Sequence, residues 1–147
     1  MKRIILTLAA AFAAIALLAQ NDKADNILGT YKAGIGKDAY KIRIVKCPDN
    51  SYKASICWLA ERCDANGKVY TDVKNPDKSL RGVPMDKVVL ISGLKYNSEK
   101  QRWDGAKIYD PQRGIRVNVT LGFDTPKKLL VRGTVFGIGE TVTWTKE

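Results

Sequence analysis

Five side chains in the second half of the chain are of types used in acid–base catalysis: Asp77, Arg81, Asp104, Tyr109 and Asp110. If folding brings them together, two carboxylates beside an arginine would suit the hydrolysis of a glycosidic bond. Three of them also have a simpler explanation, because Asp110 can begin a turn, Asp77 can cap a helical turn and Arg81 can pair with a carboxylate. The chain has no histidine, the commonest general base, so the structural explanation is favoured over an enzyme.

A second group of residues carries the oxygen ligands that Ca²⁺ prefers. The segment 64–67 (Asp-Ala-Asn-Gly) is followed by Asp72, Asn75 and Asp77. Their spacing does not match an EF-hand loop, and Asn-Gly and Asn-Pro are ordinary turn formers. Turn structure is therefore favoured here, and we expect neither a metal nor another cofactor.

Aromatic side chains are the third group with chemical potential. Trp58, Trp103, Trp144, Tyr40 and Tyr109 fall at positions that alternation places inside the fold. They would then either pack as core or line an aromatic pocket. A barrel of about eight strands has an interior just large enough for either arrangement. Packing around a small residual cavity is the favoured interpretation.

The elements that must position these side chains are strands, because apolar and polar residues alternate with a period of two. Short turns join the segments in sequence, so we predict an all-β, antiparallel up-and-down meander of about eight strands that closes into a barrel. The expected strands are 27–33, 40–44, 52–58, 87–96, 102–109, 115–121, 128–136 and 139–145. Gly93 is a candidate bulge.

The hairpin at residues 39–59 has a register that follows from its alternation. Ile42 and Ile44 must share a buried face with Ile56 and Trp58. Paired residue numbers must then sum to an even number, which a loop with an odd number of residues satisfies. An even loop length would place Ile44 opposite Ser55 and put the two faces in conflict.

One long connection, residues 61–86, interrupts this rhythm. It carries turn signals, a short possible strand at 68–71 and one helical turn at 76–81. A long irregular connection in a compact barrel is often a lid or a binding loop, and Arg81 would suit a carboxylate or phosphate head group. The polar residues of this segment expected to contact a ligand are Asp72, Asn75, Asp77 and Arg81.

The N-terminus has the layout of an export signal. Lys2 and Arg3 precede an apolar, uncharged run over residues 4–18, and a small residue, Ala19, precedes Gln20. This run is too short and wrongly flanked for a membrane span. We therefore expect residues 1–19 to be a signal peptide, residues 20–147 to be a single domain, and the mature protein to be periplasmic or secreted. No cysteine lies near the cleavage region to carry a lipid anchor.

Composition limits the partners. Without Lys2 and Arg3 the mature chain carries 23 Lys and Arg against 15 Asp and Glu, a net charge of +8. The cations are scattered rather than arranged in a stripe with aromatics, so no nucleic-acid partner is expected. The charge would suit an anionic membrane surface, a cell-wall polymer or an acidic small molecule. Because the cations are scattered, a solvated surface with a positive bias is the favoured interpretation.

The three cysteines, Cys47, Cys57 and Cys63, are an odd number, so at least one is unpaired or bonded to another chain. Cys47 and Cys57 are too far apart along the hairpin for a disulfide. Cys57 with Cys63 is the one local pair that remains open.

Several stretches resemble domain-of-unknown-function family 2147, a group of small exported bacterial proteins. They are ILGTY (27–31), TDVKNPDKSLRGVPM (71–85), LISGLKY (90–96), RWDGAKIYDPQRG (102–114), RGTVFG (132–137) and TVTWTK (141–146). The resemblance implies export and a lipocalin-like (calycin-type) barrel, and no assigned activity.

Residues 29–31 (Gly-Thr-Tyr) resemble the first-strand Gly-x-Trp motif of lipocalin-like barrels, with Tyr in place of Trp. In such barrels an Arg near the chain end often covers that Trp, and the family usually has an Arg where Glu140 stands here. The family also often has a second cysteine near Ala54.

We therefore interpret the chain as an exported, non-catalytic binding protein whose barrel mouth takes a small apolar or anionic amphiphilic ligand. The alternative is a module that docks on an envelope component or a protein through its basic surface; an enzyme using Asp and Arg residues is the weakest reading. The expected ligand-binding residues are Tyr40, Ile42, Trp58, Asp72, Asn75, Asp77, Arg81, Trp103 and Tyr109.

Overall fold

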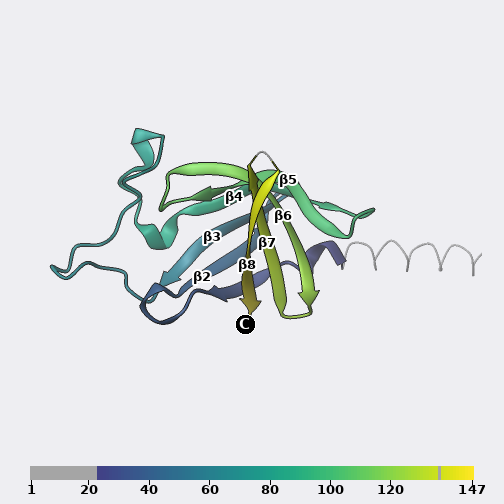
Figure 1. The fold of residues 1–147 in the computed structure, drawn as a ribbon, viewed down its shortest axis with the longest axis horizontal. Coiled ribbons are helices and arrows are strands. Elements are labelled where there is room, and N and C mark those ends of the chain that lie inside the picture. Colours follow the sequence, from purple (N-terminus) through teal and green to yellow (C-terminus); the bar gives the residue numbers. More distant parts are fainter. Residues whose placement is uncertain (1–22, 136) are drawn as a thin grey trace, which may run out of the picture.

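The chain forms a closed antiparallel barrel in which each strand pairs with the next and β1 pairs with β8 (Figure 1). The computed structural model describes residues 23–135 and 137–147, so the predicted signal peptide lies outside the described residues. The strands are β1 (Gly29–Ala33), β2 (Tyr40–Lys46), β3 (Tyr52–Leu59), β4 (Val89–Asn97), β5 (Arg102–Asp110), β6 (Ile115–Thr125), β7 (Lys128–Val135) and β8 (Ile138–Lys146). The predicted fold class is confirmed.

Three short 3₁₀ helices lie in the connections: η1 (Gly36–Asp38), η2 (Lys78–Leu80) and η3 (Met85–Lys87). The η2 helix lies within the predicted helical turn, whereas the predicted strand at 68–71 is reduced to isolated bridges of Cys63 with Val69 and Thr71 with Pro84. Gly93 has a positive φ of 71°, and the pairing of β4 with β3 shifts beside it, as predicted for a bulge.

The β2–β3 hairpin has the predicted register over most of its length. Ile42 pairs with Ile56, Ile44 with Ala54, and the loop runs from 47 to 51. The backbone N–H of Cys47 donates to the carbonyl of Ser51 at 2.8 Å, which closes the turn. Ile42, Ile44 and Ile56 are all buried in the lumen of the barrel.

Trp58 does not follow this pattern, and its predicted inward position is wrong. Lys41 pairs with Trp58 while Ile42 pairs with Ile56, so Cys57 is an extra residue in β3. Such a bulge reverses the facing of every later side chain. Trp58 therefore lies on the outer surface, 41% exposed, with Lys41 Nζ 5.5 Å from its ring centroid.

All three cysteines are free thiols in the structure. Because Lys46 pairs with Tyr52, Cys57 lies well along β3 from Cys47, as the predicted separation required. The bulge leaves Cys57 exposed on the outer surface, and Cys63 lies in the connection after β3.

A short helical turn at residues 23–25 covers one end of the barrel, on the right of Figure 1. Trp103 Nε1 donates a hydrogen bond to the carbonyl of Ala24 at 3.0 Å. Tyr52 Oη donates to Asp25 at 2.6 Å, and Lys46 Nζ lies 3.0 Å from the same carboxylate. The hydrogen bond from Tyr52, followed by Lys46, holds the pKa of Asp25 below its ordinary value. This end of the barrel is therefore closed.

A lysine completes the closure. Lys146 Nζ donates to the carbonyl of Asn26 at 2.6 Å and lies 6.0 Å from the ring centroid of Tyr31 and 5.8 Å from that of Phe123. Tyr31 is fully buried and donates its hydroxyl proton to the carbonyl of Ile27 at 2.8 Å. The cation that covers the first-strand aromatic is thus Lys146 on β8, and not a residue at position 140.

The hairpin register makes a quantitative prediction. Replacing Ile44 with Ala should lower the free energy of unfolding by about 2–4 kcal/mol, because it leaves a cavity in the packed core. Val45→Ala on the outer face of the same strand is the matched control and should cost under about 0.5 kcal/mol. Urea titrations of both variants measure the difference, and equal effects would place Ile44 outside the core.

Buried tyrosines make the barrel sensitive to alkali. Burial raises the pKa of Tyr31, Tyr40 and Tyr52, and raises that of Tyr109 to about 12. The folded protein therefore keeps these protons above pH ~10, where the unfolded chain loses them, so stability is full below that pH and falls as pH rises further. Urea midpoints across pH ~8–12, with tyrosinate absorbance recorded in parallel, should show this fall. A constant midpoint up to pH ~12 would contradict it.

Candidate functional site

The other end of the barrel is open and leads into a cavity of about 1220 Å³. Its walls come from the inner faces of the strands and from three connections at this end: β1–β2, β3–β4 and β5–β6. In Figure 1 these connections lie away from the helical turn that closes the barrel. The interior is thus packed at one end and hollow at the other.

The wall of this cavity holds large apolar side chains that water can reach. Six of them line the cavity and are between 42% and 81% exposed. They are Tyr70, Val73, Ile115, Val135, Ile138 and Val142. Soluble proteins rarely expose a contiguous apolar surface unless something binds to it.

Aromatic side chains form the inner part of the cavity. Trp144 is 1% exposed, and its indole N–H has no hydrogen-bond partner among the described residues. Its ring is tilted against that of Tyr31, with centroids 6.5 Å apart. Tyr40 pairs with Ala33, and the register of β1 with β8 continues toward Ala33 beside Trp144, so Tyr40 and Trp144 lie on either side of Ala33 on the inner face. The inner wall therefore offers polar hydrogens within an apolar surface.

The rim of the cavity carries charges of both signs that largely pair with each other. Arg113 lies 3.7 Å from the carboxylate of Asp110 and 3.9 Å from that of Glu140. Lys74 Nζ donates to the carbonyl of Gln112 at 2.8 Å. Ion pairs this exposed contribute little to stability, so the rim is better described as a solvated border than as an anion-binding cluster.

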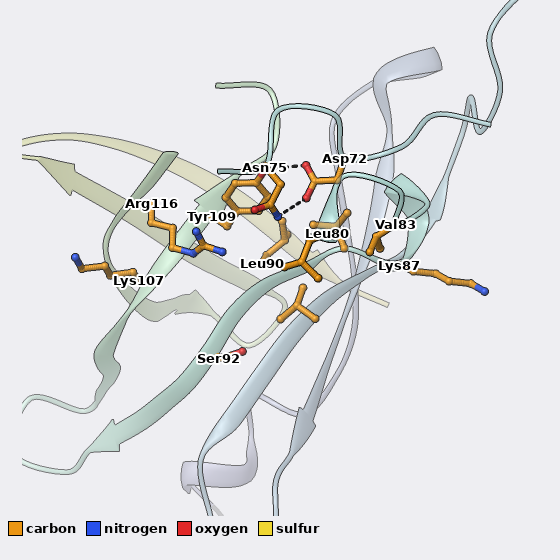
Figure 2. A pocket seen from close by; sticks show the side chains of 12 residues that line it. Asp72, Asn75, Leu80, Val83, Lys87, Leu90, Ser92, Lys107, Tyr109 and Arg116 are labelled. Carbon is orange, nitrogen blue, oxygen red and sulfur yellow. Dashed lines mark hydrogen bonds between the residues drawn. The ribbon is translucent and has the colours of Figure 1, made fainter. Parts of the chain in front are cut away.

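A buried polar network anchors the long connection between β3 and β4. Asp72 is 1% exposed and accepts hydrogen bonds from Tyr109 Oη at 2.7 Å and from Asn75 Nδ2 at 2.8 Å (Figure 2). Its backbone N–H donates to the carbonyl of Val83 at 3.0 Å. The carboxylate thus links the connection to β5 through Tyr109, and it also links two residues within the connection, Asp72 and Asn75.

The other two predicted lid residues, Asp77 and Arg81, make hydrogen bonds within the same connection. Asp77 accepts from the N–H and the hydroxyl of Ser79 and so caps η2, as expected. Arg81 Nε donates to the carbonyl of Asn75 at 2.8 Å and lines neither of the two cavities described here. The structure does not bring Arg81 to the barrel mouth, and its role as a head-group anchor stays a prediction with no cavity beside it.

A contact between loops adds to this anchoring. Gly114 has a positive φ of 68°, and a Cβ there would overlap the carbonyl of Lys74. Only glycine allows the backbone of the β5–β6 turn to approach the long connection so closely. Residues 60–88 and 110–114 therefore pack directly against each other at the open end.

The five residues considered for acid–base catalysis do not converge. Asp104 pairs with Arg102 at 3.2 Å near the start of β5, whereas Asp110 ends that strand and accepts from the N–H of Gln112. Six residues of extended strand separate the two carboxylates by roughly 20 Å. Tyr109 is held by Asp72. The arrangement does not form a paired-carboxylate site.

The segment that was considered for calcium binding, residues 64–67, forms a turn. Asp64 accepts hydrogen bonds from the backbone N–H groups of Asn66 and Lys68, both at 2.9 Å, which is the turn structure that the sequence favoured. Within residues 23–135 and 137–147, no three acidic or cysteine side chains come together in an arrangement that could hold a metal ion.

A smaller pocket of about 500 Å³ lies on the other side of the Asp72 network. Arg116, Lys107 and Lys87 are at its border (Figure 2), and Arg116 lies 4.9 Å from the ring centroid of Tyr109. Tyr109 and Leu90 line both this pocket and the barrel cavity. These two side chains are therefore part of a wall that the two spaces share.

Of the predicted ligand-binding residues, the structure brings Tyr40 and Tyr109 to the barrel cavity. Ile42 belongs to the packed core, Trp103 to the closed end and Trp58 to the outer surface. Asp72 and Asn75 line the smaller pocket. The sequence analysis did not select the apolar residues of the last hairpin, Val135, Ile138 and Val142, although alternation in that segment was visible.

Comparisons with known proteins agree on the fold. A family model described as "uncharacterized protein conserved in bacteria" (DUF2147) matches residues 29–146. The solved structure of protein HP1028 from Helicobacter pylori, reported as belonging to the lipocalin family, superposes with a TM-score of 0.66 at 22% identity over 82% of each chain. No curated protein sequence matches. Among the described residues, no helix has the length and apolar character to cross a membrane.

The Asp72 network can be tested by removing one hydroxyl. Tyr109→Phe should lower the free energy of unfolding by about 1–3 kcal/mol, because Asp72 Oδ1 loses its donor while staying buried. Protease cleavage within residues 60–88 should become faster as the connection loosens. Tyr70→Phe, which changes a half-exposed tyrosine of the same connection, is the control. If both variants behave alike, the Asp72–Tyr109 hydrogen bond does not anchor the connection.

Proposed function

We propose that this protein, which belongs to the bacterial family DUF2147 and has a lipocalin-like barrel, is a binding protein for a small, largely apolar ligand. The ligand occupies the cavity at the open end. The observation that carries the proposal is the set of apolar side chains that water reaches inside this cavity, Ile138 (81% exposed) and Val73 (65% exposed) being the most open. Covering this surface with an apolar molecule stabilises the complex in proportion to the area buried.

The dimensions of the cavity support this assignment. Ligand pockets usually have volumes of about 300–1000 Å³ and apolar walls with a few polar groups. The barrel cavity, at about 1220 Å³ including its open mouth, has this character. The absence of converging acid–base groups among the described residues favours binding over catalysis, since Asp104 and Asp110 lie at opposite ends of β5.

Residues 60–88 form the border over which a ligand enters. They contribute Tyr70, Val73 and Met85 to the cavity wall, while Asp72 fixes the same connection to Tyr109. This connection acts as a tethered flap: its apolar side chains face the ligand, and its buried carboxylate limits how far it opens. Export of the mature protein, with residues 1–19 as the signal peptide, is part of the proposal and places the ligand outside the cytoplasm.

A second function is favoured by the loop tips. Ile35 is 90% exposed beside η1, and Ile138 at the start of β8 is 81% exposed. Two such side chains, on a mature chain with 23 Lys and Arg against 15 Asp and Glu, a net charge of +8, would suit docking of the open end on an anionic envelope surface. Docking by this surface would persist when the cavity is blocked, which separates it from ligand binding.

The experiment is a titration with the fluorescent apolar probe N-phenylnaphthylamine. The protein should bind the probe with micromolar affinity, and Val142→Lys should weaken binding about tenfold or more, because the substitution places a charge in the apolar cavity. Val45→Lys, on the outer face of β2 and 39% exposed, is the matched control and should bind normally. If the wild-type protein binds no apolar probe, or if both variants weaken equally, the cavity is not the binding site.

A further inference from the structure

The inner wall of the cavity contains a polar group that the fold leaves without a partner. Trp144 is 1% exposed, and its Nε1–H makes no hydrogen bond to any described residue. Buried donors are almost always paired, since an unpaired one forfeits its hydrogen bond to water without gaining another. The other two tryptophans differ: Trp103 donates to Ala24, and Trp58 lies on the outer surface.

The neighbour of this N–H is the hydroxyl of Tyr40. Both residues line the cavity from the inner face, Tyr40 from the start of β2 and Trp144 from the end of β8. Tyr40 pairs with Ala33 on β1, and continuing the register of β1 with β8 (Lys32 with Thr145) by one residue sets Trp144 on the other side of Ala33. The two aromatic side chains therefore flank the small Ala33 on the inner face. Burial raises the pKa of Tyr40 and Trp144 opposes that rise, in line with this placement.

A tyrosine hydroxyl that accepts from an indole N–H has its own proton free to donate. Accepting one hydrogen bond also polarises the hydroxyl and makes it a better donor. Because Tyr40 lines the cavity, this proton is available to an acceptor on a ligand there. Trp144 therefore acts as a positioning residue, and Tyr40 as the group that touches the ligand.

The charges around this pair select the kind of acceptor. The cations that line the cavity are Lys37, Lys74 and Arg113, all in the connections at the rim. Arg113 is already paired with Asp110 and Glu140. An anionic head group on the inner wall would be desolvated without an unpaired cation beside it. A neutral oxygen avoids this cost.

We propose that the Tyr40 hydroxyl, oriented by the Trp144 N–H, binds a neutral carbonyl oxygen, so that the ligand of this protein is an apolar molecule with an ester, ketone or amide group. This proposal rests on the proposed ligand binding in the barrel and adds the chemical class of the ligand. It assigns the carbonyl to the inner cavity and the hydrocarbon to the apolar walls nearer the rim.

Three matched ligands test the class. Methyl decanoate, decanoate and undecane have similar apolar lengths and differ in the oxygen they present. In displacement of N-phenylnaphthylamine, the ester should bind about 3–10-fold more tightly than undecane, the range expected for one net hydrogen bond. It should also bind more tightly than decanoate at neutral pH. Equal affinities for ester and alkane, or stronger binding of decanoate, would overturn the proposal.

To test Trp144 as a positioning residue, an experiment must measure a property that a change in packing alone would leave unaltered. The chain has 3 tryptophans, so a ¹⁵N-labelled sample gives few indole N–H signals, which Trp58→Phe and Trp103→Phe help to assign. Methyl decanoate should move the Trp144 signal downfield as the N–H forms its hydrogen bond to Tyr40, whereas undecane should not. A Trp144 signal that responds equally to both ligands would remove the proposed relay.

Two variants complete the design. Tyr40→Phe and Trp144→Phe should each abolish the preference for ester over alkane while still binding the probe, and Tyr40→Phe should also abolish the downfield shift of Trp144. Tyr40→Phe removes only one oxygen, so it keeps the test valid if Trp144→Phe does not fold. A full ester preference in Tyr40→Phe would overturn the inference alone, whereas failure of the wild-type protein to bind any probe would overturn the proposed function with it.

Discussion

The lumen exists because β1 pairs with β8. Two residue pairs carry this closure, Tyr31 with Lys146 and Lys32 with Thr145. Without it the sheet would have open edges, and the inward side chains of β1 and β8 would face solvent instead of one another. With it, Tyr31 and Trp144 come from opposite ends of the chain into tilted contact at 6.5 Å. The closure thus places the beginning and the end of the chain in one packed interior.

The two ends of the barrel use the same alternating pattern for opposite purposes. At the closed end, aromatic hydroxyl and indole groups find backbone or carboxylate partners, as Tyr31, Tyr52 and Trp103 do. At the open end, aliphatic side chains face a space that no part of the described chain fills. Satisfied polar groups and dense packing give the first end rigidity. The second end keeps the surface that a ligand can cover, and this division is what makes a barrel of this size a container.

Local chemistry predicted most of the fold. Alternation and turn residues identified the strands, and the odd-numbered loop of the β2–β3 hairpin followed from the need to keep Ile42, Ile44 and Ile56 on one face. Trp58 was misplaced because the bulge at Cys57 depends on pairing with β2 and leaves no glycine in the sequence to mark it. The bulge at Gly93, which carries that mark, was predicted correctly.

The residues of the candidate site were harder to predict from the sequence than the strands were. A segment as polar as residues 61–86 suggests solvent-exposed turns, yet Asp72 is buried against Tyr109, a partner far along the chain. No local pattern encodes that pairing. Alternation can indicate which side chains of the last hairpin face inward, such as Val135, Ile138 and Val142. It cannot predict whether inward side chains from opposite walls meet, and therefore it cannot predict the cavity.

The close approach of Gly114 to the carbonyl of Lys74 has a bearing on how this barrel can change over evolution or by engineering. Residues 60–88 and the β5–β6 turn share a contact with no room for a side chain, so neither can be lengthened, shortened or replaced while the other keeps its shape. The two segments are therefore expected to change together, although they are separate in the sequence. A graft meant to alter the mouth of the barrel would have to carry both pieces together.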